Sequence, residues 1–189
     1  MRTSKQDELV EKALTIFNRN GFHATGMDML ARQTGISKTS MYKYFATKED
    51  LILATLKLRD EKFLRWFTVR VEELAATPEK QLLAIFDVLA EWFAQPEFSN
   101  CMFIKATAEY QSPDHSIHQQ AARHKKQKLA YITKLAKAAK YPNPTTIARH
   151  LMLLIEGATV IAHIGFTKNP AGDAKSAAQN TLANAEKTA

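Results

Sequence analysis

Two short stretches near the N-terminus each carry helix signals, and only three residues separate them. The first runs from Met27 to about Thr34 and the second from Lys38 to about Phe45. Gly35 is the residue that most readily ends a helix in a left-handed conformation, and Ser37 is a preferred N-cap. Two short helices joined by so brief a Gly-containing turn pack at a steep angle, so the spacing predicts a helix-turn-helix.

Start and stop signals divide the rest of the chain into helices as well. Ser4 with Asp7 predicts the start of a first helix, which ends at Asn20-Gly21, and Thr25 with Asp28 predicts the start of the second. Thr47 with Asp50 opens a helix over residues 48–73. Five later helices are expected: from Thr77-Pro78 to about residue 95, from Asn100 to about 110, from Ser112-Pro113 to about 140, from Asn143-Pro144 to 165, and a last one after Pro170. With only 6 Gly and 6 Pro in 189 residues, the chain is predicted to be all-α.

Several classes of protein are not expected from this sequence. Cys101 is the single cysteine, so no intramolecular disulfide can form and a reducing cytoplasm is the expected location. The N-terminal residues contain no apolar signal-peptide core, and Glu156 and His163 interrupt the apolar stretch 151–166. We therefore expect a cytoplasmic protein with no membrane span.

The net charge of +7 is concentrated in one part of the chain. Residues 101–150 carry nine Lys and Arg against two Asp and Glu, and the run 123–140 contains no acidic residue. We expect a solvated basic helix face here; the alternative is long-range attraction of an anionic ligand or of DNA phosphates.

The second helix of the predicted helix-turn-helix has two different sides. Met41 and Phe45, four residues apart, are expected to anchor its inner side, while Lys38, Thr39, Tyr42 and Lys43 fall on or near the other. Hydroxyl and ammonium groups are suited to contact DNA phosphates. A plain three-helix bundle that binds no DNA remains the alternative from spacing alone.

Residues 21–51 resemble the N-terminal signature of the TetR/AcrR family of bacterial transcriptional regulators, through Gly21-Phe22-His23-Ala24-Thr25, Leu30-Ala31 and the segment from Gly35 to Leu51. The resemblance implies an all-α homodimer. Its N-terminal three-helix helix-turn-helix domain, residues 1–47, binds DNA, and a helical ligand-binding and dimerisation domain, residues 48–189, follows with 48–73 as the connecting helix. It further implies a repressor that binds a palindromic double-stranded operator and is released by a small-molecule effector.

The helix pattern and the resemblance together give a set of predicted DNA-contacting residues: Thr25, Ser37, Lys38, Thr39, Tyr42, Lys43, Tyr44 and Lys48. Thr39 stands where the family usually has Gly, which bears on base preference.

Two further sets are predicted in the helical domain. A cluster rich in aromatic residues is expected to line the effector pocket, with Glu109 and His163 as possible orienting groups: Phe63, Trp66, Phe67, Trp92, Phe103, Ala106, Glu109, Tyr110 and Tyr131. The two last helices are apolar or rich in small residues and are expected to form the dimer interface through Leu151, Leu154, Ile155, Gly157, Ala158, Ile161, Ala162, Ala178 and Leu182.

Other interpretations of single residues are weaker. His115, His118 and His124 lack supporting Cys or carboxylate ligands, so no metal is expected. The sequence contains no motif of a catalytic or cofactor site, so no cofactor and no catalytic residue is expected, and the chain is not predicted to be an enzyme. Cys101 at a helix start is an alternative redox or electrophile sensor. A helical adaptor that binds only protein is the remaining alternative, but it would leave the Tyr, Lys and Thr surface unexplained.

Overall fold

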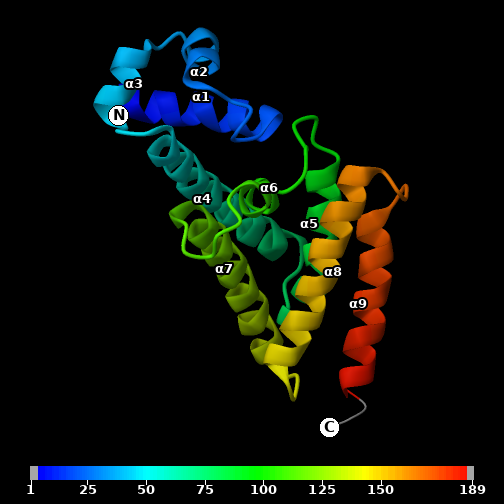
Figure 1. Cartoon of the computed structure of the whole chain (residues 1–189). Helices are drawn as coiled ribbons and strands as arrows, with labels where there is room; N and C mark the ends of the chain where they lie inside the picture. Colours follow the sequence, from blue (N-terminus) through cyan, green and yellow to red (C-terminus); the bar gives the residue numbers. More distant parts are fainter. Residues whose placement is uncertain (1–3, 187–189) are drawn as a thin grey trace. The chain divides into compact units, whose positions relative to one another are not determined.

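Residues 4–186, which the computed structural model describes, form nine α-helices and no strand (Figure 1). The all-α prediction is confirmed. In chain order the helices are α1 (Lys5–Asn20), α2 (Met27–Thr34), α3 (Lys38–Tyr44), α4 (Lys48–Leu74), α5 (Pro78–Phe93), α6 (Met102–Glu109), α7 (Ser116–Ala138), α8 (Pro144–Ile164) and α9 (Pro170–Glu186).

Most helix ends follow the capping residues in the sequence. The Ser4 hydroxyl accepts the Asp7 N–H, and the Asp7 carboxylate accepts the Ser4 N–H, which is the predicted capping box of α1. The predicted start of α2 at Met27 is confirmed, but its predicted cap and the predicted start of one later helix are wrong. Gly26, not Thr25, is the N-cap of α2. Likewise α7 begins at Ser116, because residues 112–115 form a turn closed by the His115 N–H to the Ser112 carbonyl.

The described chain divides into two compact units. The first contains residues 4–63 and Met102–His124; the second contains Leu64–Cys101 and the residues from Lys125 onward. Helices α4 and α7 contribute to both units. The functional boundary predicted after residue 47 does not coincide with a limit of either unit. The first unit continues to Phe63 and also includes α6 and the start of α7.

The core of the first unit comes from the inner sides of its helices. Leu9 and Phe17 of α1, Leu30 of α2 and Met41 of α3 are fully buried, and so is Leu51 of α4. Their burial stabilises α2 and α3, which are individually too short to be stable in water. The predicted anchoring side of α3 is thereby confirmed at Met41.

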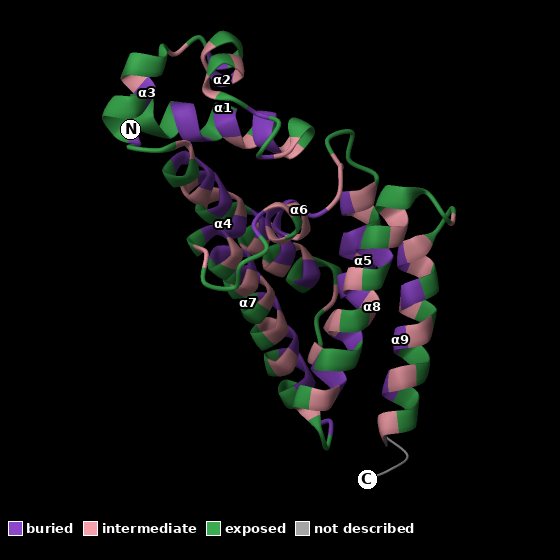
Figure 2. Cartoon of the chain, in the orientation of Figure 1, coloured by how far each residue is buried: buried purple, intermediate pink, exposed green. Residues whose placement is uncertain are grey.

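The second unit is built around the packing of α5, α8 and α9 (Figure 2). Helix α8 is long and apolar enough to cross a membrane by length and composition alone, a test that core helices of soluble proteins also pass. Five predicted interface residues are buried within the protomer itself, so they are not available on its surface: Leu151, Ile155, Ala158, Ala178 and Leu182. The apolar pattern predicted burial but did not distinguish the chain's own core from a partner.

An internal charge cluster joins α7 to α8. Lys128 is only 2% exposed, and its ammonium group donates to Glu156 at 2.8 Å. Lys125 donates to the other carboxylate oxygen. Burial lowers the pKa of Lys128, with Lys125 adding to the effect. Burial alone would raise the pKa of Glu156, but Lys128 and Lys125 together hold it below its ordinary value. The prediction of a wholly solvated basic face over 123–140 is therefore wrong for these two lysines.

We expect Glu156→Gln to destabilise the protein by about 3–5 kcal/mol, because it leaves a buried ammonium group without its counter-charge. Urea unfolding followed by circular dichroism measures the change. Because the folded-state pKa of Glu156 lies below its ordinary value of 4.5, the stabilisation is present above that pH and is lost as the pH falls below it. The variant should lack this part of the pH dependence.

Glu91→Gln is the matched control, since Glu91 pairs with Arg70 at a more exposed position and should cost at most about 1 kcal/mol. Adding Lys128→Met to Glu156→Gln should restore most of the lost stability. Equal stability of Glu156→Gln and wild type would contradict the importance of the cluster.

Candidate nucleic-acid interface

The turn between α2 and α3 has a fixed local geometry. Gly35 ends α2 with φ of 73°, a left-handed conformation that favours glycine, and its N–H donates to Ala31 at 3.1 Å. Ser37 starts α3 by accepting the Ser40 N–H at 3.2 Å. The Thr34 hydroxyl accepts the Ile36 N–H at 3.2 Å inside the turn. Because these backbone groups are bonded locally, α3 has a defined direction relative to α2.

Helix α3 presents a polar surface on the side opposite Met41. Tyr42 is 50% exposed and Tyr44 38%. Ser37, Lys38, Thr39 and Lys43 are exposed as well. Six of the eight predicted DNA-contacting residues are thus on the surface of one short segment, and their contact with DNA stays a prediction.

The two lysines of this surface differ in their partners. Lys38 donates to Asp28 of α2 at 2.8 Å, and this hydrogen bond raises the pKa of Lys38. No ion pair of Lys43 is found in the part of the chain that the structure describes. The sequence identified Asp28 only as a helix-start signal, because nothing in the local pattern shows that residues ten apart meet across the turn.

The side chains of Thr25 and Lys48, the other two predicted DNA-contacting residues, bind backbone groups of the chain itself. Thr25 is fully buried, and its hydroxyl donates to the Gly21 carbonyl at 2.6 Å. The Lys48 ammonium group donates to the carbonyls of Phe22 and Thr25 at 3.1 and 3.3 Å. Both side chains satisfy backbone groups of the irregular loop 21–26 and are not part of the exposed α3 surface.

Glu109 at the end of α6 satisfies the same loop from another direction. Its carboxylate accepts the Phe22 N–H at 2.9 and 3.1 Å and the His23 N–H at 2.5 Å. Gly21 has φ of 83°, and a Cβ there would lie 2.9 Å from a Glu109 oxygen. Glu109 therefore binds the backbone of the loop before α2, rather than orienting a ligand as the sequence suggested.

Aromatic and histidine side chains surround this attachment. Tyr110 packs edge-on against Phe22, and burial raises the pKa of its hydroxyl to about 12. His118 contacts the Tyr110 carbonyl at 2.8 Å, and His115 lies 3.5 Å from Glu49. Among the described residues no group of three His, Cys, Asp or Glu side chains could hold a metal ion.

A buried polar network that the sequence did not predict joins α4 to α7 in the first unit. His124 contacts Asp60 at 2.7 Å, and Gln120 donates to the same carboxylate at 3.2 Å. Phe103 stacks on the His124 ring with centroids 3.8 Å apart. Asp60 and His124 are 64 residues apart in sequence, so no local pattern could have paired them.

The predicted effector-pocket residues are divided between the two units. Phe63, Phe103, Ala106, Glu109 and Tyr110 belong to the first, whereas Trp66, Phe67, Trp92 and Tyr131 belong to the second. Phe67 packs edge-on against Tyr131, whose hydroxyl is the one buried side-chain polar atom without a hydrogen-bond partner among the described residues. The pocket stays a prediction.

Cys101 lies in the second unit and is 4% exposed. Its sulfur is 3.4 Å from the Lys125 ammonium group, which belongs to the internal charge cluster. The thiol is thus packed beside a cation, and its role as a sensor stays a prediction.

Comparisons with known proteins agree with this architecture. Residues 9–55 match the family model described as bacterial regulatory proteins, tetR family. The HTH-type transcriptional regulator YjdC of Escherichia coli is 23% identical over 153 residues, covering 81% of this chain and 80% of that protein. SCO4454, a TetR-family transcriptional regulator from Streptomyces coelicolor, has a similar fold with a TM-score of 0.86, 24% identity and 94% coverage of both chains. NemR of E. coli has a TM-score of 0.82 at 20% identity, over 93% of this chain and 95% of that one.

We expect Glu109→Ala to release the loop before α2. The change removes the acceptor of two backbone N–H groups, which should lower the free energy of unfolding by about 1–3 kcal/mol. Amide hydrogen exchange should accelerate at Phe22 and His23. Glu61→Ala, on α4 of the same unit and with no hydrogen bond or ion pair to the loop before α2 in the described part of the chain, is the control and should leave these two amides unchanged. Unaltered exchange at Phe22 and His23 in Glu109→Ala would contradict the attachment.

Proposed function

Since the chain is a tetR-family transcriptional regulator, we propose that it is a repressor that binds a palindromic operator as a homodimer and is released by a small molecule. The observation that carries the proposal is the exposed side of α3, where hydroxyl and ammonium groups stand opposite the buried Met41. Such a regulator works on chromosomal DNA, so the cytoplasm is the proposed location.

The α3 surface suits the major groove in size and chemistry. A seven-residue helix with one buried side is held by α1 and α2, as in other helix-turn-helix proteins whose second helix enters the groove. Lys43 and the hydroxyl of Tyr42 are donors of the kind that phosphate oxygens accept, and in this proposal the exposed Thr39 contacts base edges. Lys38 supports the surface through its ion pair with Asp28.

Operator binding should depend on Lys43 much more than on basic residues elsewhere. We expect Lys43→Ala to weaken binding to the chain's own upstream DNA, because a phosphate in each half-site is then no longer neutralised. The slope of log affinity against log salt should become shallower by about one for each such phosphate. Gel-shift titration at several salt concentrations measures both quantities.

Lys137→Ala removes the same charge from an exposed position on α7 and is the matched control. Its affinity and salt slope should stay close to those of wild type. If both variants lose affinity equally, the effect is one of net charge, and the assignment of the α3 surface fails.

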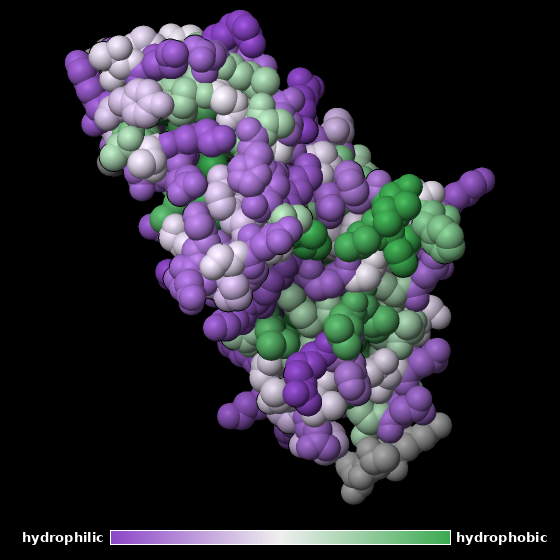
Figure 3. Space-filling model, in the orientation of Figure 1, coloured by the Kyte–Doolittle hydropathy of each residue, from purple (hydrophilic) through white to green (hydrophobic). Residues whose placement is uncertain are grey.

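The proposed dimer forms through the exposed side of α8. Leu153 is 71% exposed, Val160 37% and Ile164 68%. Gly157 is exposed between them. The spacings of four, three and four residues put these positions on one stripe of the helix, and Figure 3 shows hydrophobic surface over this part of the molecule. A second copy would remove this apolar stripe from water through a two-fold, self-complementary contact.

Val160→Glu should therefore break the dimer, because it places a charge in an apolar contact. We expect sedimentation to show a monomer at micromolar concentration and gel shifts to show loss of operator binding. Val69→Glu is the matched control, since Val69 is 47% exposed on α4, and it should leave the assembly unchanged. A dimeric Val160→Glu protein would show that the interface lies on another surface.

Release by a small molecule is supported by the environment of Tyr131. Its hydroxyl is buried beside Phe67 without a partner, and buried polar groups of native proteins nearly always have one. A ligand that offers an acceptor would satisfy it. Within the first unit, Glu109 of α6 holds the loop before α2, so a change at α6 would reach the proposed DNA-binding helices. Effector binding and operator binding are then thermodynamically linked, so each changes the affinity of the protein for the other ligand.

A further inference from the structure

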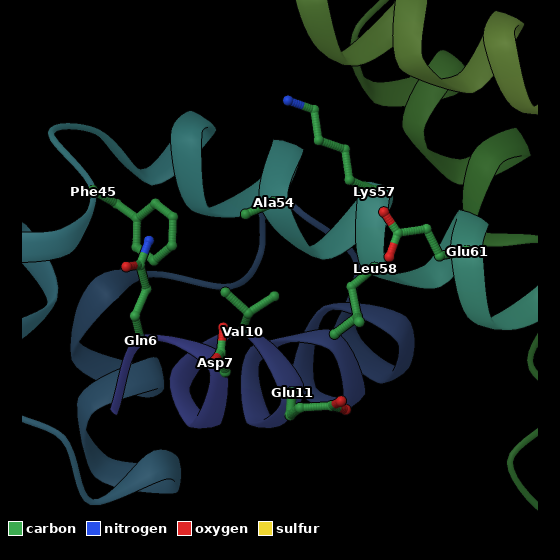
Figure 4. Close-up of a pocket in the computed structure, with 9 residues that line it drawn as sticks. All are labelled: Gln6, Asp7, Val10, Glu11, Phe45, Ala54, Lys57, Leu58 and Glu61. Atoms are coloured by element: carbon green, nitrogen blue, oxygen red, sulfur yellow. The ribbon is translucent and has the colours of Figure 1, made fainter. Parts of the chain in front are cut away.

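A groove of about 440 Å³ lies between α1 and the first half of α4, within the first unit (Figure 4). Its floor is apolar. Val10 of α1 is 9% exposed and Phe45, which follows α3, is 8% exposed. Leu58 of α4 is half-buried. In Figure 4 the side chains of Val10 and Leu58 point into the space between the two helices. The volume falls within the range of small-molecule sites in proteins.

The rim of the groove is acidic, in a chain whose net charge is +7. Asp7 and Glu11 line it from α1, and Glu61 lines it from α4. Asp7 accepts the Ser4 N–H in the capping box of α1, and Glu11 forms an ion pair with Lys62. No ion pair of Glu61 is found within the described part of the chain. Lys57 is the one basic residue of the lining, and Figure 4 shows its side chain extending away from α1.

This combination selects for the charge and shape of a ligand. Acidic side chains repel DNA phosphates and carboxylates, so an anion is disfavoured here. An apolar floor favours a ligand with an alkyl or aryl part, and Glu61, at one end of the groove in Figure 4, favours an ammonium group at that end. We propose that the groove binds a small organic ammonium ion that carries such an apolar group.

The groove is separate from the predicted effector pocket, since the two share no residue. Its occupant would contact α1, α4 and Phe45 together. Helices α1 and α4 flank the helix-turn-helix along the chain and Phe45 directly follows α3, so the site is placed to affect this unit directly. The inference does not depend on the proposed operator or effector.

Three probes with the same apolar part and different charge test the proposal: phenylbutylamine, phenylbutanol and phenylbutyrate. Isothermal titration of the full chain without DNA should give the amine an affinity at least about tenfold higher than the alcohol, with no binding of the carboxylate at this site. Raising the salt concentration should weaken the amine only, because exposed charges are screened.

Two substitutions locate the binding. Glu61→Gln keeps the shape of the side chain and should weaken the amine about three- to tenfold without affecting the alcohol. Ala54→Trp fills the groove, which Ala54 lines, and should abolish binding of both. Glu8→Gln is the control, because Glu8 lies on α1 outside the groove and pairs with Lys12.

Equal affinities for the amine and the alcohol would overturn the proposal, as would the absence of amine binding. Amine binding that persists unchanged in both Glu61→Gln and Ala54→Trp would place the cation elsewhere and would also overturn it. Circular dichroism and thermal melting of each variant check that the chain is folded. Gel shifts of the same variants report operator binding separately, so failure of this inference is distinguishable from failure of the repressor proposal.

Discussion

The loop between α1 and α2 needs hydrogen-bond partners that its own short sequence does not supply. Outside regular structure, buried N–H and C=O groups must find other acceptors and donors or lose free energy. Lys48 provides donors to the carbonyls of Phe22 and Thr25, and Glu109 provides acceptors to the N–H groups of Phe22 and His23. The position of α2, and through it α3, depends on these two side chains from α4 and α6.

This arrangement explains why α6 belongs to the same compact unit as α1, α2, α3 and the first part of α4. Glu109 is 87 residues from Phe22 in sequence, and its carboxylate replaces water at the loop. A change in the direction of α6 would alter the partners of the loop before it altered any contact of α3 itself. The geometry therefore supplies a physical route between α6 and the exposed surface of α3, which is the proposed DNA-binding surface, without requiring α3 to unfold.

Local signals predicted most of the helices but fewer of the site residues. Ser4 with Asp7, Gly35 and Ser37 act within four residues, so the sequence alone identifies the ends of α1, α2 and α3. The exposed side of α3 follows from helical periodicity. The burial of Thr25 and the attachment of Lys48 and Glu109 depend on tertiary contacts, and no pattern of spacing encodes them. For the same reason the partner of Lys125 and Lys128 was missed, since Glu156 lies on a different helix.

The distribution of charge limits how this protein can bind DNA tightly. Two lysines of the most basic segment, Lys125 and Lys128, share the single negative charge of Glu156 inside the second unit, so the sequence count overstates the positive charge available at the surface. The groove between α1 and α4 is acidic and adds none. In the proposed function the phosphate contacts of each subunit come chiefly from the exposed residues around α3, and each would contribute a limited, salt-dependent share of affinity. A subunit with few such contacts would bind weakly, so the proposed repressor needs two α3 helices on one operator, and the proposed pairing through α8 would then be part of DNA recognition itself.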